Sequence, residues 1–404
     1  MSARLANQDA AVPGGNPPFI VFSDDWGEHP SSCQHLFRQI AVRHTVLWVN
    51  TIGMRSPKLS GSDLRKAGLK ISKMLKGRHG GSRGSGKPEP PVHVCQPFML
   101  PFSSIRLVRW LNKRWVLRSV RRAAAELQIR RPVVVSTVPN ACDYVNDFGA
   151  SRVVYYCVDD FTKWPGLEHD LVRDMERQLI AGADVLVATS RVLYQKLGVG
   201  QKPVHLLTHG VDLPLFSAEA DAEHPCLRGI PKPRAGYFGL FDERTDQSLM
   251  AAVTAANPNM EFVFTGPLAT APTAVLRSRP NVHFTGSVPY GELSALVKGL
   301  DVLFIAYVVN DFTASISPLK LKEYIVTGKT VIATPMPEAL LLKEHINIAA
   351  SAADWTAVLS RGLQPDVAGR KAVVQRAMAH ESWAAKACEF VQLCLGARQA
   401  GSSV

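Results

Sequence analysis

The chain has 404 residues, 46% of them hydrophobic and 20% charged, which is the composition of a folded, soluble enzyme and not of a disordered or fibrous chain. Its length favours two domains over a single hydrophobic core. The seven cysteines are scattered without a C-x-x-C pair or a metal-ligand spacing, so we expect free thiols in a reducing compartment.

The positive charge is concentrated in the first half of the chain. Residues 1–200 hold 28 Lys and Arg against 16 Asp and Glu, and the remainder is balanced at 18 of each. The start of the chain lacks the pattern of a signal peptide, and no apolar run approaches the roughly 20 residues that cross a bilayer. We therefore expect a cytoplasmic protein, peripheral at the inner face of the membrane.

Short apolar strands alternate with helical stretches from residue 18, which is typical of right-handed βαβ units and a parallel sheet. The strands of this first series are FIVFS, HTVLWVN, RPVVVSTVP, RVVYYCVDDF, DVLVATS and PVHLLTHGVD. We predict a disordered stretch over 1–17 and a Rossmann-like domain over 18–216.

Acidic residues follow two of these strands, where open α/β sheets bind ligands. The candidate catalytic residues are Asp24, Asp25 and His29 after the first strand, and Asp159 and Asp160 after RVVYYCV. A solvated loop is the alternative for His29, and a helix cap or an ion pair is the alternative for either member of the second pair. For Ser190, capping of the following helix is the favoured interpretation.

Two basic amphipathic helices, over 62–78 and 103–127, flank a glycine-rich loop in an insertion that covers about 55–125. Residues 51–131 carry 19 basic side chains against three acidic ones. This pattern fits the surface of an anionic membrane, and the alternative is a packed helix with solvated cations. The predicted membrane-surface residues are Lys70, Lys73, Arg106, Trp110, Arg114, Trp115 and Arg118.

A small, charged and proline-rich stretch over 217–233 predicts a linker. A second series of strands and helices follows, which predicts a second Rossmann-like domain over 234–380. We expect a helix over 381–396 that packs back on the first domain, and a tail over 397–404. The predicted fold class is therefore α/β, with two Rossmann-like, doubly wound parallel sheets that face a central cleft.

The stretch SISPLKLKEYIVTGKTVIAT, residues 315–334, predicts a helix that begins at the edge of this cleft. Ser317 would cap its free amides, Pro318 would take the first helical position, and Gly328 would end it. The amides and Lys320 would bind a diphosphate, and Glu323 would accept two hydrogen bonds from a ribose diol. An ordinary capped helix with surface lysines is the alternative.

Several segments, in the same order, resemble bacterial glycosyltransferases of the GT-B fold, close to the retaining enzymes of family 4. SPLKLKEYIVTGKTVIAT is similar to the family element PLK-x-x-EYLA-x-GKPVV, and THGVDLPLF is similar to the turn that precedes the family's linker. Matching segments cover nearly the whole chain. They are AGYFGLFDERTDQSLM, FVFTGP, NVHFTGSVPYGELSALVKGLDVLFIAY and VVYYCVDDFTKWPGLEHDLVRDMERQLIAGADVLVATS.

The resemblance implies that residues 18–216 form an acceptor domain and residues 234–380 a nucleotide-sugar-binding domain. It also implies a role for several residues of the donor site. Glu323 aligns with the second glutamate of the family's Glu-x7-Glu pair, which binds the ribose, whereas Ser315 replaces the first, which binds the sugar. Ser315, Thr313 or Asp311 would then contact the sugar. Arg244 occupies the place of the arginine that grips the pyrophosphate, without the customary lysine. The full predicted donor site is Gly239, Arg244, Gly266, Ser315, Ser317, Pro318, Leu319, Lys320 and Glu323.

We therefore expect a glycosyltransferase that uses a nucleotide diphosphate sugar, with UDP as the first choice of base, no cofactor and no metal. The resemblance implies retention of configuration, and the basic helices indicate a glycan or polyprenyl-diphosphate-linked acceptor. No nucleic acid partner is expected. The alternatives are a nucleotide-sugar epimerase on the same scaffold, and a non-enzymatic protein that binds anionic lipid or RNA through its basic segment.

Overall fold

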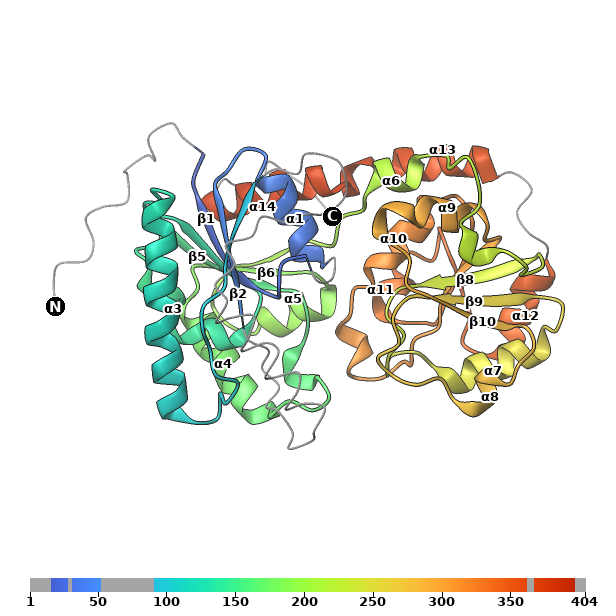
Figure 1. The fold of residues 1–404 in the computed structure, drawn as a ribbon, viewed down its shortest axis with the longest axis horizontal. Helices are drawn as coiled ribbons and strands as arrows, with labels where there is room; N and C mark the ends of the chain where they lie inside the picture. Colours follow the sequence, from blue (N-terminus) through green and yellow to red (C-terminus); the bar gives the residue numbers. More distant parts are fainter. Residues whose placement is uncertain (1–15, 28–30, 52–90, 362–366, 397–404) are drawn as a thin grey trace.

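The computed structural model describes residues 16–27, 31–51, 91–361 and 367–396. They form two α/β domains that lie side by side (Figure 1). In this part of the chain the first domain has a seven-stranded parallel sheet in the order β3-β2-β1-β4-β5-β6-β7, and the second a six-stranded parallel sheet in the order β10-β9-β8-β11-β12-β13. The predicted class, two doubly wound parallel sheets, is confirmed.

The strands of the first domain are runs of apolar residues because helices cover both faces of a parallel sheet. Every residue of β1, for example, is buried. The strands are β1 (Phe19–Ser23), β2 (Val46–Asn50), β3 (Val92–Cys95), β4 (Val133–Ser136), β5 (Arg152–Cys157), β6 (Val185–Ala188) and β7 (Val204–Leu206). The helices are α1 (Ser32–Ile40), α3 (Arg106–Glu126), α4 (His169–Gly182) and α5 (Arg191–Leu197), with short turns η1 (Pro139–Asp143), η2 (Val145–Asp147) and η3 (Phe161–Lys163).

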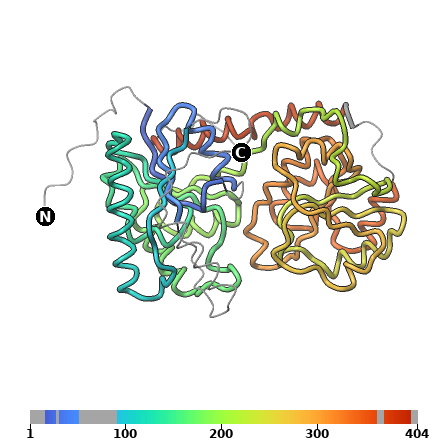
Figure 2. Tube along the Cα trace, in the orientation of Figure 1, coloured from blue at the N-terminus to red at the C-terminus, as the bar shows by residue number. Residues whose placement is uncertain are grey.

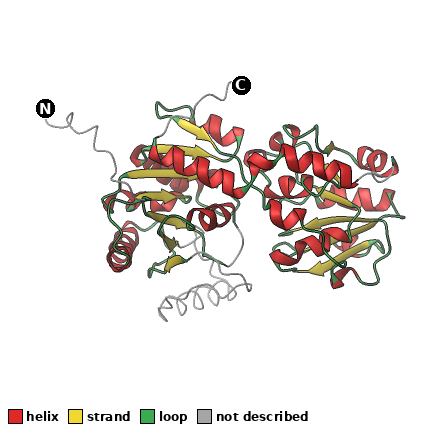
Figure 3. Ribbon diagram, turned by 90° about the horizontal axis from the view of Figure 1, so that it is seen from above, coloured by secondary structure: helices red, strands yellow, loops and turns green. Residues whose placement is uncertain are grey.

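The second domain repeats this arrangement around a core that is rich in aromatic side chains. Its strands are β8 (Arg234–Phe238), β9 (Glu261–Thr265), β10 (Val282–Gly286), β11 (Val302–Ile305), β12 (Thr330–Ala333) and β13 (Asn347–Ile348). Helices lie on both sides of each sheet (Figure 3). Those of the second domain are α7 (Gln247–Ala256), α8 (Ala274–Arg277), α9 (Leu293–Lys298), α10 (Leu319–Ile325), α11 (Pro337–Leu340), α12 (Ala352–Ser360) and α13 (Val367–Ala377), with turns η4 (Pro225–Leu227), η5 (Tyr290–Glu292) and η6 (Thr313–Ser315).

The last helix, α14 (Trp383–Leu395), returns to the first domain (Figures 1 and 2). Its apolar face joins the core on the α1 side of the sheet, where the ring of Phe390 lies edge-on to that of Phe37 at 5.8 Å between centroids. The chain therefore crosses between the domains twice, first through α6 (Leu213–Ser217) and again through η7 (Ala379–Glu381).

The two crossings are paired with each other. We call residues 207–213 and 379–383 the crossing segments; the Val211 amide donates to the Glu381 carbonyl at 2.8 Å, and Val211 also bridges Ser382. The buried ammonium of Lys322, from α10, donates to the Thr208 hydroxyl at 2.9 Å and to the Glu381 carboxylate. Burial alone would raise the pKa of Glu381, but two lysine ammoniums lower it. The crossing segments and α10 are thus held together by ionic contacts away from solvent.

Candidate functional site

The predicted donor residues come from loops after β8 and β9 and from α10, all at the carboxyl ends of the second sheet. Loops that follow strands at this edge are where open α/β sheets bind their ligands. The structure brings Gly239, Gly266, Lys320 and Glu323 together in this region. It also places Asp159, from the first domain, within the electrostatic field of Arg244.

Two glycines bring the backbone after β8 close to the side chain of Lys320. Gly239 has a φ of +133°, and a Cβ there would lie 1.9 Å from Cε of Lys320 and 2.6 Å from its Nζ. Gly266 has a φ of +141°, and its Cβ would lie 2.0 Å from the carbonyl oxygen of Gly239. Neither position accepts a side chain without displacement of its neighbour. The Lys320 ammonium is therefore seated against bare backbone, 5.5 Å from the centre of the Tyr237 ring.

Arg244 lies in the loop after β8, where its guanidinium is oriented by a neighbour in the same loop. Nε donates to both carboxylate oxygens of Asp242 at 2.9 Å, and the guanidinium carbon lies 5.5 Å from the centre of the Tyr307 ring. A planar guanidinium held in this way points its N–H donors and its positive charge in one fixed direction. Arg244 and Lys320 are two cations near one strand end.

The Glu323 carboxylate is buried, with only 3% of the residue exposed. The Tyr290 hydroxyl donates to its Oε1 at 3.0 Å. Burial raises the pKa of Glu323 to about 7, although the Lys320 ammonium and the Tyr290 hydrogen bond oppose the rise and Asp212 adds to it. Near neutral pH the carboxylate is therefore divided between its ionised and protonated forms. A shifted pKa of this kind is typical of functional sites.

The start of α10 differs from the sequence prediction. Pro318 occupies the N-cap position instead of the first helical one, Leu319 begins the helix, and Ser317 makes no capping hydrogen bond. The reason is local: Pro318 has an extended ψ of 110°, so the helical conformation begins one residue later. The helix also ends at Ile325, before Gly328, which has a φ of +75° in the following turn. The predicted serine-capped amide cradle is thus wrong in its detail.

Ser315, predicted to contact the sugar in place of a glutamate, is 1% exposed. Its hydroxyl donates to the carbonyl of Phe312 at 3.2 Å, and its own carbonyl accepts from Ser190 of the first domain at 2.8 Å. The Ser190 hydroxyl also accepts from the Leu193 amide, which confirms the favoured interpretation of a cap on α5. Ser315 therefore helps to fix the loop between the domains.

The loop after β1 is stabilised by its own hydrogen bonds. The Asp24 carboxylate accepts from the hydroxyls of Ser23 at 2.8 Å and Ser31 at 3.2 Å, and from the amide of Gln34 at 3.1 Å. The same Gln34 side chain donates to the Asp25 carbonyl at 3.2 Å. His29 lies outside the described residues. These contacts fix Asp24 and Asp25 in place at the carboxyl end of β1.

Asp159 and Asp160 are adjacent but have different surroundings. Asp160 caps η3 and accepts from the Lys196 ammonium at 2.7 Å, so its carboxylate has the structural contacts that were the alternative to catalysis. Burial alone would raise the pKa of Asp160, but Lys196 and Thr162 lower it. Asp159 is half-buried; burial raises its pKa to about 7, while Arg244 across the domain boundary lowers it. Asp159 is the better placed of the two to act on a ligand.

Sequence inspection missed the residues that orient these groups. Tyr290 and Asp242 hold Glu323 and Arg244, and the Asp212 carboxylate acts on Glu323 from the first crossing segment. Asp242 had a signal, since it lies two residues before the predicted arginine. For Tyr290, which is 33 residues from its partner, the sequence holds none.

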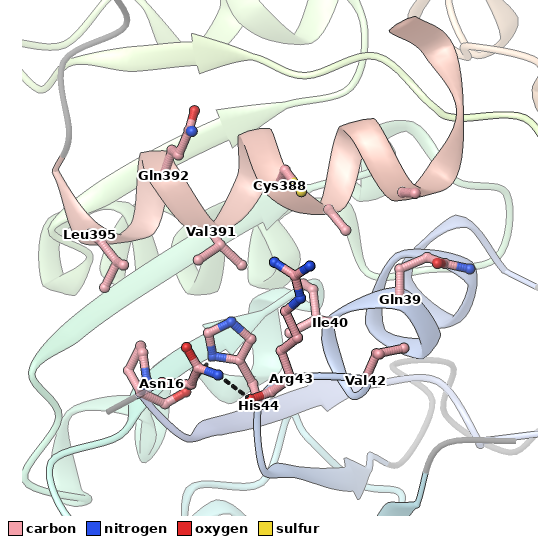
Figure 4. A pocket seen from close by; sticks show the side chains of 13 residues that line it. Asn16, Gln39, Ile40, Val42, Arg43, His44, Cys388, Val391, Gln392 and Leu395 are labelled. Atoms are coloured by element: carbon pink, nitrogen blue, oxygen red, sulfur yellow. Dashed lines mark hydrogen bonds between the residues drawn. The ribbon is translucent and has the colours of Figure 1, made fainter. Parts of the chain in front are cut away.

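Cavity size alone does not locate this site. A pocket of about 520 Å³ lies between α1 and α14, where Arg43, His44, Cys388 and Val391 line it (Figure 4). His44 and the other residues that precede β1 and β2 are at the amino ends of the strands, opposite to the donor residues. A smaller pocket of about 310 Å³ includes Ser317 and Lys322 beside the crossing segments. The charged residues around Glu323, and not the volume of a pocket, identify that region as the candidate site.

The outward face of α3 is basic and partly apolar. Arg106, Arg114 and Arg118 are exposed, and the guanidinium of Arg114 lies 4.9 Å from the centre of the half-exposed Trp110 ring. Trp115 instead meets Phe98 edge-on at 5.0 Å, so it lies on the flank of the helix. Lys70 and Lys73 lie outside the described residues. Of the helices described, none has the length and apolarity needed to traverse a bilayer.

The described residues also bear on metal binding. Within residues 16–27, 31–51, 91–361 and 367–396, no three His, Cys, Asp or Glu side chains are arranged to hold a metal ion. The carboxylates that lie closest to the donor region, Asp242 and Glu323, are instead engaged with Arg244 and Tyr290. The expectation that no metal takes part stays a prediction.

No protein-family model matches the chain. In sequence, it is 27% identical over 175 residues to the provisionally named teichuronic acid biosynthesis glycosyltransferase TuaH of Bacillus subtilis (strain 168). The match covers 41% of this chain and 44% of that protein. The chain thus matches less than half the length of its curated relative.

Solved structures resemble the whole chain in fold. Anabaena HepE in complex with UDP and glucose has a TM-score of 0.62 at 12% identity, over 95% of this chain and 100% of that one. Sucrose-phosphate synthase from Thermosynechococcus elongatus has a TM-score of 0.65 at 14% identity, over 94% and 98%. An E. coli structure named for trehalose-6-phosphate, bound with UDP-2-fluoro glucose, has a TM-score of 0.63 at 12% identity, over 93% and 99%. The chain has the GT-B fold.

Proposed function

We propose that this protein is a glycosyltransferase. It would move a sugar from a nucleotide diphosphate sugar, with UDP as the nucleotide, to a hydroxyl of a glycan acceptor. The observation that carries the proposal is the buried carboxylate of Glu323 beside the Lys320 ammonium, at the carboxyl ends of the second sheet. A carboxylate and a cation in this order suit a pentose diol followed by a diphosphate. The GT-B fold and the partial sequence match to TuaH support this interpretation.

The proposed chemistry is electrostatic. When the bond between sugar and diphosphate breaks, negative charge develops on the leaving phosphate. Lys320 and Arg244 are already oriented, by Gly239 and Asp242, to stabilise that charge without reorganisation. These two cations would do the work that a metal ion does elsewhere, and transfer would proceed with retention of configuration. Asp24 and Asp25 follow β1 and Asp159 follows β5, so all three lie beyond the carboxyl ends of strands of the first sheet, and we propose that they face the acceptor.

Specific ligand binding tests this function. Because a ligand that binds only the folded state raises apparent stability, about 100-fold excess over Kd adds about 2.7 kcal/mol. We expect UDP and UDP-glucose to raise the melting temperature of the full chain by several degrees, and GDP and ADP to raise it less. Incubation of the donor alone should not convert its sugar, whereas an epimerase would. The proposal fails if neither UDP nor any UDP-sugar stabilises the protein.

We further propose that the acceptor is lipid-linked, in the synthesis of a cell-surface glycan or exopolysaccharide, and that α3 holds the first domain against the anionic inner leaflet. The support is the exposed basic face of α3, with Trp110 among its arginines. Each cation near such a surface adds about 1 kcal/mol, and aromatic rings favour the headgroup region.

The membrane proposal predicts salt-sensitive vesicle binding. The full chain should sediment with vesicles that contain anionic phospholipid at low salt, and should dissociate as the ionic strength approaches about 0.5 M. Replacement of Arg106 and Arg118 by glutamate should reduce binding at least about tenfold, since four charges change. The matched control is glutamate at the exposed Arg228 and Arg277 of the second domain, where binding should be unchanged. Equal losses in both variants would mean that net charge alone is responsible.

A further inference from the structure

We propose that Tyr290 is a positioning residue that holds Glu323 ready for the pentose of the donor, and that His35 of the first domain holds Tyr290 in turn. This inference rests on the proposed function and extends it to two residues that sequence comparison does not indicate. It is carried by a continuous line of contacts from α1, through η5, to α10.

The first contact is a hydrogen bond to a buried carboxylate. The Tyr290 hydroxyl lies 3.0 Å from Oε1 of Glu323 and donates to it. Burial and the Glu323 carboxylate raise the pKa of Tyr290, so the phenol keeps its proton and remains a donor at all physiological pH values. A hydrogen bond to an ionised group is stronger than one to a neutral group. The bond therefore favours the ionised form of Glu323, the form that accepts two hydrogen bonds from a diol.

The second contact crosses the domain boundary. The His35 ring, on α1, lies 5.0 Å from the Tyr290 ring and is stacked on the Trp383 ring at 5.3 Å with an interplanar angle of 10°. On its other side Tyr290 meets Phe216 edge-on at 6.3 Å. The tyrosine ring is thus in contact with His35 of the first domain and with Phe216 of α6, and His35 is in turn packed on Trp383 of the second crossing segment.

His35 behaves as a rigid, neutral ring. Only 7% of it is exposed, and its Nε2 has no hydrogen-bond partner among the residues that the structure describes. Burial, together with the positive charge of Arg38, lowers its pKa to about 4. An imidazole that stays neutral and contacts the Tyr290 and Trp383 rings acts here through packing, not through proton transfer.

Several charged or titratable groups lie around the Glu323 carboxylate. Lys320 lies on the same helix, Asp212 at the start of α6, and Tyr290 on η5, while the Tyr324 phenol is the next residue along the chain. Of these, the Lys320 ammonium and the Tyr290 hydroxyl favour the ionised carboxylate, and Asp212 disfavours it. Loss of the Tyr290 hydroxyl should therefore move the titration of Glu323 to higher pH.

The test measures the affinity of the full chain for UDP-glucose, whose two phosphates carry a constant charge between about pH 6 and pH 9. Tyr290→Phe keeps the ring and its contacts with His35 but removes the donor. If the pKa of Glu323 rises by about one unit, UDP-glucose binds about tenfold more weakly near pH 6 and within about twofold of wild type near pH 9. A variant that is only less well folded would lose affinity equally at every pH.

The matched control is Tyr144→Phe in the core of the first domain. It removes a buried phenolic oxygen that has no hydrogen-bond partner within the described part of the chain. It should leave both the affinity and its pH midpoint unchanged. In a double-mutant cycle, Tyr290→Phe should have no further effect on affinity in a Glu323→Ala background, because the group that it orients is absent.

His35→Ala should weaken binding about two- to fivefold, and this effect should disappear in a Tyr290→Phe background. Additive losses would show that His35 acts elsewhere, and they would overturn its part of the proposal. An unshifted pH midpoint in Tyr290→Phe would overturn the positioning role itself. If the wild-type protein binds no UDP-sugar at all, the proposed function fails first, and that result is distinguishable because no variant is needed to obtain it.

Discussion

Replacing Glu323 with alanine should weaken the binding of UDP-glucose at least about 100-fold. The carboxylate is buried, so the two hydrogen bonds that it offers a pentose diol are charge-assisted and shielded from solvent. Bonds of this kind contribute about 1.5–3 kcal/mol each, and every 1.4 kcal/mol is a factor of ten in affinity. Isothermal titration calorimetry with the purified full chain measures the loss directly.

The same carboxylate sets a pH dependence. With the pKa of Glu323 raised to about 7, the group is mostly protonated near pH 6 and mostly ionised near pH 8. Since the ionised form accepts more hydrogen bonds, wild-type affinity should increase about tenfold over that interval. Glu323→Gln should bind weakly and with no pH dependence, and alanine at the exposed Glu126 should behave as wild type. A Glu323→Ala protein with unchanged affinity would contradict the proposed donor site.

Removal of the Lys320 side chain should reduce kcat/KM for sugar transfer about 10²- to 10³-fold. The ammonium is held against the backbone of Gly239, where it would meet the leaving diphosphate, and the loss of one preorganised group of this kind typically has that effect on rate. Steady-state rates with saturating acceptor, measured for Lys320→Ala and for the exposed Lys343→Ala as control, test the prediction.

Gly239→Ala offers an independent approach to the same lysine. Its methyl group would occupy the space of Lys320 Cε, and the residue would have to keep a φ of +133° that alanine rarely adopts. We therefore expect a similar loss of rate from a protein whose lysine is still present. Normal transfer by Gly239→Ala would show that the close approach of lysine and backbone is not needed.

The fold was predictable because its signals are local and repeated. Most strands are dominated by apolar residues, as in β1 and β11, and the glycine, proline and polar residues between them mark where they end. Covered on both faces, such strands form parallel sheets. The nature of the donor residues could be proposed for a similar reason, since they follow strand ends or begin a helix.

What could not be predicted depends on contacts between distant parts of the chain. Nothing near Glu323 in the sequence indicates that Tyr290 bonds to it, or that Lys320 closes against Gly239. The start of α10 was misplaced because Ser-Pro fits two helix boundaries that differ by one residue, and the observed ψ of Pro318 selects the later one. Buried pairs such as Lys196 with Asp160 likewise become visible only when the sheets are assembled.

Lys322 contacts the crossing segments, and the next residue, Glu323, is the proposed ligand of the donor pentose. Because the two residues are adjacent, the donor site is tied to the connection between the domains. Lys322 is hydrogen-bonded to both crossing segments. If the two domains rotate against each other, α10 would therefore lie close to the axis of rotation. Points near a pivot travel least when two bodies rotate. The nucleoside end of a donor, seated at Glu323, would thus stay almost stationary while the first domain rotates, and the parts of that domain farthest from the crossing segments would move through the longest arc.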